Sequence, residues 1–251
     1  MRIDKYLSEQ LGSRTKAKNA ILKGGVLVNG KTVDCSYEVR DGDEVKVIPF
    51  EENYVSAGGF KLAKALKDFS IDVSGKIFAD IGASTGGFTD CLLKNGAQKV
   101  YCIDVGESQL DESLKDKNVV IIDNFNARNL HSRLFSEKID GVVIDVSFIS
   151  LTYVLGAVSQ ILSDGNSVIA LVKPQFECES RHVGKNGIVH DKRVHEKILI
   201  KIFDFANSVG LAPRGATDAP IIKGKNIEYV VHLIKGEKAC TLDEYLKSVT
   251  L

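Results

Sequence analysis

The chain has 251 residues, of which 44% are hydrophobic and 26% charged, and this composition is typical of a soluble globular protein with one full α/β domain and a small module. It has no apolar run near the roughly 18 residues that a membrane-spanning helix needs, and its polar N-terminus is not a signal peptide. The 33 basic and 33 acidic residues cancel, which over the whole chain argues weakly against nucleic-acid binding. The five scattered cysteines include no Cys-X-X-Cys pair, which favours reduced thiols and a cytoplasmic location.

Charge is unevenly placed in residues 1–48. From Arg2 to Lys31 there are seven basic and two acidic residues, whereas residues 34–44 are acidic. A local basic face decides contact with nucleic acid more than the total charge does. The alternative for such a face is a solvated helix surface.

The same residues predict a small α+β module. Apolar spacing indicates a short helix that ends at Gly12 and a second over residues 14–23, with Ser13 as its cap. Asn29-Gly30 predicts a hairpin turn, and CSYEV and DEVKVI are two further extended pieces. Residues 49–57 are polar, contain Pro49 and are interpreted as an interdomain linker.

The stretch IFADIGASTGGFTD, residues 77–90, indicates a strand, a glycine-rich turn and the start of a helix. Such a turn lets a ligand approach the backbone and its free N–H groups, although a plain turn with glycines for packing is the alternative. Its form DIGASTGG resembles the turn of S-adenosylmethionine-dependent methyltransferases. The residues that we expect to bind this cofactor here are Asp80, Gly82, Ala83, Ser84, Gly86, Gly87 and Phe88.

The rest of the chain alternates strands and helices, which predicts a mainly parallel sheet covered on both faces, with an antiparallel hairpin last among seven strands. Charged residues end several strands, where ligands gather in such sheets. A polar residue is also a common strand terminator, so each of these is weak alone. Asp104 is expected at the ribose, Asp123, Asn124 and Phe125 beside the adenine, and Asp145 and Lys173 at two further strand ends.

Together these segments resemble the TlyA (hemolysin A-like) family of rRNA 2′-O-methyltransferases. The signatures are SAGGFKLAKAL, ADIGASTGGFTD, IDVGESQL, DVSFISL, LVKPQFE, GKNGIVHD and KGKNIEYVVHL, and RIDKYL, SRTKAKNAI and GGVLVNGK resemble an S4-type RNA-binding domain. The resemblance implies such a domain over residues 1–48 and a Rossmann-like, FtsJ-like methyltransferase domain over 58–251. It also implies a catalytic tetrad of Lys61, Asp145, Lys173 and Glu228. On pattern alone Lys61 would be an exposed helix lysine.

In that tetrad Lys173 would accept the proton of a ribose hydroxyl, provided that burial and the nearby Lys61 favour its neutral form. Asp145 and Glu228 would hold the two lysines in place.

No metal is required, and the five histidines lack metal-ligand spacing. The loop 184–191 is expected to move over the pocket or to contact RNA, with a long exposed connection as the alternative. The residues expected to bind RNA are Arg2, Lys5, Arg14, Lys16, Lys18, Lys31, Arg181 and Lys185.

The resemblance implies methylation of a cytidine in rRNA by a cytoplasmic enzyme that acts on ribosomal subunits or ribosomes, as a monomer or weak dimer. The chain starts at RIDKYL and ends soon after its last helix, so we expect large-subunit rRNA to be the target, with small-subunit rRNA as the alternative. A membrane-active hemolysin-like protein and a non-catalytic RNA-binding factor are the competing functions. The missing membrane signals argue against the first and the complete tetrad against the second.

Overall fold

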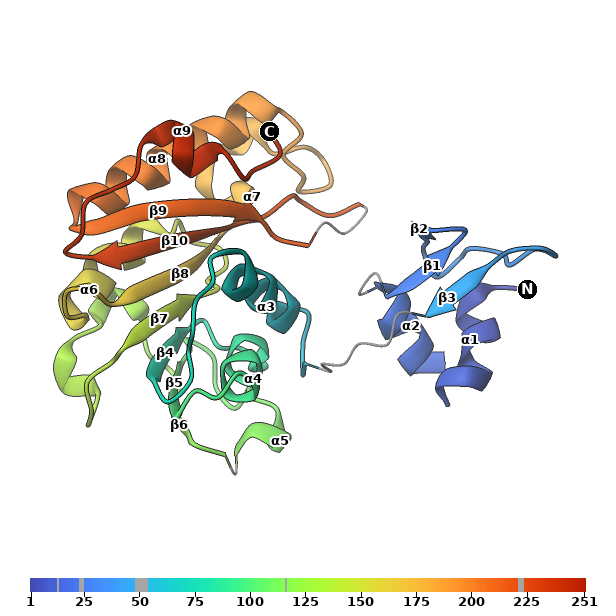
Figure 1. Ribbon diagram of the computed structural model, residues 1–251, viewed down its shortest axis with the longest axis horizontal. Coiled ribbons are helices and arrows are strands. Elements are labelled where there is room, and N and C mark those ends of the chain that lie inside the picture. Colours follow the sequence, from blue (N-terminus) through green and yellow to red (C-terminus); the bar gives the residue numbers. More distant parts are fainter. Residues whose placement is uncertain (13, 23–24, 48–53, 116, 221–223) are drawn as a thin grey trace. The chain divides into compact units, whose positions relative to one another are not determined.

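A computed structural model describes residues 1–12, 14–22, 25–47, 54–115, 117–220 and 224–251, without the side chains of residues 15, 16, 19, 22, 31 and 32. The chain divides into two compact units, one within residues 1–53 and one formed by residues 54–221 and 225–251 (Figure 1). Of the expected linker, residues 49–53 lie outside the described residues, and residues 54–57 belong to the second unit. Tyr54 is 3% exposed, with its ring centroid 5.0 Å from that of Phe60. This packing starts the second unit at residue 54 instead of 58.

The first unit contains two helices, α1 (Ile3–Leu11) and α2 (Arg14–Leu22), and the strands β1 (Val26–Val28), β2 (Lys31–Thr32) and β3 (Val45–Val47). Within its described part the strands form an antiparallel sheet in the order β2-β1-β3. Asn29 and Gly30 both have positive φ, as the predicted hairpin turn requires. The apolar core consists of Ile3, Leu7, Ala17, Ile21, Val26 and Val28.

Ser13, the expected cap of α2, lies outside the described residues. Within the described chain, residues 35–39, which were expected to be an extended piece, form no more than a single bridge, from Arg2 to Glu38. The reason is a turn at Asp34, whose carbonyl oxygen accepts from the backbone N–H of Tyr37 at 3.1 Å.

The second unit is built on a sheet that has seven strands among the described residues. Five run parallel, β4 (Ile77–Ile81), β5 (Lys99–Ile103), β6 (Val119–Ile122), β7 (Gly141–Ile144) and β8 (Ser167–Val172). The hairpin of β9 (Leu211–Asp218) and β10 (Tyr229–Lys235) is antiparallel, and the order is β6-β5-β4-β7-β8-β10-β9. The predicted fold is thus confirmed.

Helices cover both faces of this sheet (Figure 1). On one face lie α3 (Gly58–Asp68), α4 (Gly87–Lys94) and α5 (Glu112–Lys115), which share a core with Phe78, Val100 and Ile169. On the other lie α6 (Thr152–Ile161), α8 (Lys192–Ser208) and α9 (Leu242–Leu246), which pack on alternate residues of the same strands, such as Ala79 and Val168. The remaining short helices are α7 (Pro174–Glu177), η1 (Ala127–Asn129), η2 (Ser132–Leu134) and η3 (Ser180–His182). Since β4, β5, β7 and β8 are parallel, their carboxyl ends meet at one edge, where ligands bind in such sheets.

Candidate active site

The glycine-rich turn after β4 lies against the turn that follows β7. Gly82 has φ 81°, and a Cβ there would lie 2.6 Å from the carbonyl oxygen of Asp145. Gly86 (φ 91°) precedes α4, and a Cβ at Gly87 would lie 2.1 Å from Oγ of Ser56. Gly82 therefore lets the turn lie directly against the backbone of Asp145, and Gly87 leaves room for the side chain of Ser56.

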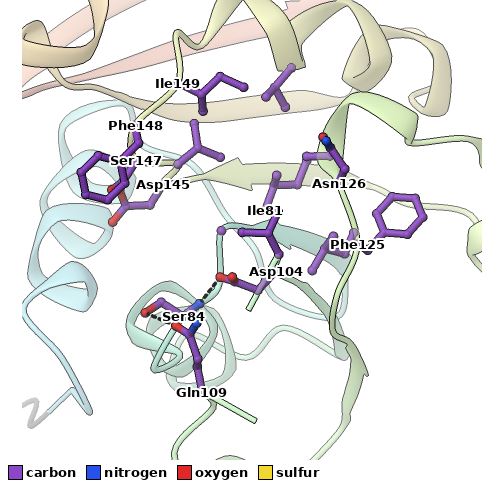
Figure 2. Close-up of a pocket in the computed structure, with 16 residues that line it drawn as sticks. Ile81, Ser84, Asp104, Gln109, Phe125, Asn126, Asp145, Ser147, Phe148 and Ile149 are labelled. Atoms are coloured by element: carbon purple, nitrogen blue, oxygen red, sulfur yellow. Dashed lines mark hydrogen bonds between the residues drawn. The ribbon is translucent and has the colours of Figure 1, made fainter. Parts of the chain in front are cut away.

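Two adjoining cavities open at this edge of the sheet. The first has a volume of about 340 Å³, and Figure 2 shows Asp145, Ser147 and Phe148 on one side of it and Ser84, Asp104 and Gln109 on the other. Phe125 and Asn126 line its far end. The second, of about 200 Å³, lies over the glycine-rich turn and is lined by Ser56, Gly58, Gly82, Ala83, Ser84, Thr85, Gly87, Phe88, Asp145, Ser147 and Lys173. Because Gly82, Ser84, Asp145 and Ser147 line both, the two cavities adjoin, and together they form the cleft at this edge of the sheet.

Asp104 fixes the shape of the first cavity. One oxygen of its carboxylate accepts from the backbone N–H of Ser84 and the other from that of Gly106, both at 2.8 Å. Its carbonyl oxygen accepts from the N–H of Phe125 at 2.9 Å. Oγ of Ser84 also donates to Gln109 at 3.3 Å (Figure 2). Asp104 thus joins the glycine-rich turn to the segments after β5 and β6.

Lys173 and Asp145 form an ion pair at the junction of the two cavities. Lys173 follows β8 and precedes α7, and its Nζ lies 2.5 Å from Oδ1 of Asp145, which follows β7. That contact is not a directed hydrogen bond, since Lys173 donates instead to Oγ of Ser147 at 2.8 Å. The side chains of Lys173 and Asp145 are 11% and 21% exposed, so both groups are largely shielded but reachable.

A second ion pair, of Lys61 and Glu228, joins α3 to the start of β10. Nζ of Lys61 lies 2.5 Å from Oε2 of Glu228, and the two side chains are 18% and 17% exposed. Because Tyr229 pairs with Val172 in the antiparallel register, Glu228 and Lys173 are the next residues facing each other across β10 and β8. The fold therefore brings the four expected catalytic residues to neighbouring positions.

Four of the expected cofactor ligands, Asp80, Gly86, Asp123 and Asn124, are not among the described residues that line either cavity. Asp80 is fully buried in β4, and Oδ2 accepts from the hydroxyl of Thr89 at 2.6 Å. Burial raises the pKa of Asp80 to about 7, although the hydrogen bond from Thr89 opposes the shift. Asp123 accepts from the N–H of Ser108 at 2.8 Å, and the adjacent Asn124 has φ 57°. Their cofactor contacts stay predictions.

Sequence reasoning missed Ser147, Phe148 and Gln109 as lining residues. Phe148 is 90% exposed and has φ 64°, and its ring centroid lies 5.0 Å from that of Phe176. A bulky residue in the left-handed region is unusual, as is a phenyl ring in solvent at a cavity rim. The available signal was DVSF itself, where Ser147 and Phe148 follow Asp145 directly.

The basic residues of the first unit fall into two groups. Arg2 and Arg14 pair with the fully buried Asp4 at 3.2 and 3.1 Å. Burial would raise the pKa of Asp4, but the hydrogen bonds and charges of the two arginines outweigh it and lower that pKa. Lys5 and Lys18 are exposed, and the side chains of Lys16 and Lys31 lie outside the described side chains. Arg2 and Arg14 therefore hold the domain together as well as presenting charge.

The loop after α7 is tied to the segment that carries Glu228. Asn226 accepts from the N–H of Val189 and donates to the carbonyl of Gly187, both at 2.8 Å. Lys185 is exposed at its tip, and Arg181, also exposed, pairs with Glu179 at 3.2 Å. The exposed positions suit contact with phosphate, whereas movement of the loop stays a prediction.

The described residues contain no group of three or more His, Cys, Asp or Glu side chains arranged to hold a metal ion. Among the described helices, none has both the length and the apolar character to cross a membrane.

Comparison with known proteins gives two family matches. Residues 54–235 match the FtsJ-like methyltransferase family, and residues 1–45 match the S4 domain. A protein of Brachyspira hyodysenteriae named "Hemolysin A" is 43% identical over 240 residues, which are 93% of this chain and 100% of that protein. The "16S/23S rRNA (cytidine-2'-O)-methyltransferase TlyA" of Mycobacterium tuberculosis is 38% identical over 225 residues, 88% of this chain and 84% of that protein. The solved structure of a "Putative hemolysin from Streptococcus thermophilus" is 39% identical with a TM-score of 0.74, covering 98% of this chain and 94% of that one.

Proposed function

The chain belongs to the FtsJ-like methyltransferase family, and from this premise we propose that it transfers a methyl group from S-adenosylmethionine to the 2′-hydroxyl of a cytidine in rRNA. The observation that carries the proposal is the pairing of Lys173 with Asp145 at the junction of two cavities, next to the pair of Lys61 and Glu228. The S4 domain and the name of the relative in M. tuberculosis support rRNA as the substrate.

The cleft fits S-adenosylmethionine by the chemistry of its lining. Asp104 offers carboxylate oxygens to ribose hydroxyls, and Phe125 and Ile149 offer apolar surface to an adenine. The glycine-rich turn leaves room for the amino-acid part beside the first N–H groups of α4, which favour a carboxylate. When bound, the cofactor supplies a methyl group on a positively charged sulfur, open to in-line attack. Asp145 lies between the two cavities, where its negative charge complements that sulfonium.

The chain's own residues then position and deprotonate the nucleophile. We place the 2′-hydroxyl beside Lys173, whose amine would take the hydroxyl proton as the oxygen attacks the methyl group. Asp145, 2.5 Å from that amine, stabilises the ammonium so formed, and Ser147 fixes its direction. Glu228, which immediately precedes β10, pairs with Lys61 of α3 and would hold that lysine in place. Alignment of this kind can supply on the order of 7–11 kcal/mol of the acceleration.

Recognition of the RNA would be divided between the two units. Phe148 presents an exposed ring at the rim of the first cavity, which suits stacking on a base that has left its helix. The exposed Lys5 and Lys18 suit phosphates, which position a protein on RNA without reading its sequence. We propose ribosomal subunits in the cytoplasm as the substrate, with the large subunit as the main target.

The experiment uses S-adenosylmethionine with a labelled methyl group and separate small and large ribosomal subunits that lack the modification. We expect label in large-subunit rRNA, and primer extension at limiting nucleotide should stop at one cytidine 2′-O-methyl position. Label in protein or on a base, or no label in either rRNA, contradicts the proposal. Label in small-subunit rRNA, whether or not large-subunit rRNA is also labelled, contradicts the preference for the large subunit.

A further inference from the structure

Glu177 is a buried carboxylate behind the candidate active site. It ends α7, its side chain is 2% exposed, and its two oxygens accept from three donors. Oε1 accepts from the backbone N–H of Leu151 at 2.6 Å, and Oε2 accepts from Oγ of Ser150 at 2.6 Å and from Nζ of Lys201 at 3.1 Å. Removing one partner of a buried, hydrogen-bonded charge is costly, because the remaining groups are left unpaired.

These bonds join the two segments that carry the first ion pair. Residues 145–151 leave β7 at Asp145, which begins the turn, and reach the contacts of Glu177 at Ser150 and Leu151. Residues 173–177 begin with Lys173 and end with Glu177, and the N–H of Phe176 donates to the carbonyl of Lys173 at 2.9 Å. The ion pair and the contacts of Glu177 therefore connect the same two segments at opposite ends.

The first segment needs such an anchor. Phe148 holds a left-handed backbone that a bulky residue rarely adopts, so the turn would relax if its far end were released. Ser147, which directs Lys173, lies in the same turn. A carboxylate suits the position because it accepts only, whereas a glutamine would turn its NH₂ group toward Lys201 or the N–H of Leu151.

We propose that Glu177 is a positioning residue, which sets the separation of Asp145 and Lys173 by clamping the segments that carry them. The clamp rests on the proposed function, because its effect is on the transfer of the methyl group. It acts through Ser150 and Leu151 and does not touch the substrates. Lys201 binds the Glu177 carboxylate from the solvent side and balances its charge.

The test is Glu177→Gln, with Glu137→Gln as a matched control. Glu137 also accepts hydrogen bonds from a lysine and a hydroxyl, from Lys99 at 2.6 Å and from Tyr101 at 2.8 Å. Lys99 is the first residue of β5, so Glu137 lies at the end of the sheet opposite the candidate active site. The measurements are the single-turnover rate of methyl transfer with both substrates saturating, the Kd for S-adenosylhomocysteine, and the thermal midpoint. We expect Glu177→Gln to lower the rate roughly 10- to 100-fold, because a misplacement of about 1 Å can cost on the order of 100-fold, and to weaken the Kd by less than about 10-fold. Glu137→Gln should lose thermal stability but keep its rate within about twofold.

A wild-type rate in folded Glu177→Gln overturns the proposal, as does an equal loss of rate in both variants. If Glu177→Gln does not fold, Ser150→Ala removes one bond of the clamp, and an unchanged rate then overturns the proposal. A wild type that binds S-adenosylhomocysteine without transferring a methyl group contradicts the proposed function instead. In that case a higher Kd for S-adenosylhomocysteine in Glu177→Gln than in Glu137→Gln still supports the clamp, and equal Kd values reject it.

Discussion

Lys61 and Glu228 are 167 positions apart in the sequence, yet Nζ of one lies 2.5 Å from Oε2 of the other. The register of β10 on β8 then sets Glu228 across from Lys173, which has its own partner in Asp145. Each lysine is thus paired with a carboxylate of its own.

Glu228→Gln should lower kcat about 100-fold and leave the Kd for S-adenosylhomocysteine within about threefold. The reason is that the charge of Lys61 loses its partner, whereas neither residue is among the described residues that line the cavities. The matched control is Glu237→Gln, which breaks an exposed pair with Arg214. An equal fall in activity for both variants would mean that the charge of Glu228 has no special role.

Asp104→Asn should weaken the binding of S-adenosylhomocysteine by roughly 10- to 100-fold, since a hydrogen bond to a charged group contributes about 1.5–3 kcal/mol. Its carboxylate faces the first cavity and also holds the N–H of Ser84. Asp123→Asn is the comparison, because that side chain binds Ser108 and lies outside the described lining. Titration calorimetry measures the affinity of both variants for S-adenosylhomocysteine. A larger loss of affinity in Asp123→Asn would show that Asp123, and not Asp104, binds the cofactor.

Phe148→Ala should raise KM for the RNA substrate roughly 5- to 100-fold, since stacking of a base on an aromatic ring contributes about 1–3 kcal/mol. The Kd for S-adenosylhomocysteine should change far less, because the ring points into solvent at the rim. Phe148→Tyr keeps the ring and should keep KM. An unchanged KM in Phe148→Ala would show that the exposed ring does not contact the RNA.

His232 should make the second unit sensitive to mild acid. Burial, with a smaller contribution from Arg214, lowers the pKa of His232 to about 4. Because this value lies below the ordinary 6.5, the unfolded chain binds the proton more tightly. The stabilisation is complete above about pH 6.5 and is lost as the pH falls toward about 4, by up to roughly 3 kcal/mol.

The measurement is the thermal midpoint of the wild type and of His232→Gln between about pH 7 and about pH 5. The wild type should lose more of its midpoint over this range than the variant does. His131→Gln, at an exposed histidine, is the control and should follow the wild type. Parallel curves for all three proteins would exclude His232 as the source of the acid sensitivity.

The sheet was predictable because strand and helix periods alternate clearly from residue 77 onward, and charged residues mark several strand ends. The cofactor contacts were harder, as Asp80 illustrates. It stands directly before the glycine-rich turn, but as a residue of β4 it alternates toward α4, where Thr89 binds it. Spacing alone does not separate the last inward-facing residue of a strand from the first residue of its loop.

Arg2 and Arg14 show a second limit. Their positions on a basic face predicted contact with phosphate, but both bind the buried Asp4. Asp4 and Arg14 are ten positions apart in the sequence. Only the packing of α1 on α2 brings the two side chains together. Phe148 is the opposite case, because nothing in the sequence singled it out, whereas the structure exposes its ring and gives its backbone a positive φ.

The most direct test is the transfer of labelled methyl from S-adenosylmethionine to large ribosomal subunits by the wild type and by Lys173→Ala. We predict incorporation by the wild type, and a loss of at least about 1,000-fold for a variant that still folds and still binds S-adenosylhomocysteine. Incorporation by Lys173→Ala at a rate near that of the wild type would show that the amine beside Asp145 does not take the proton.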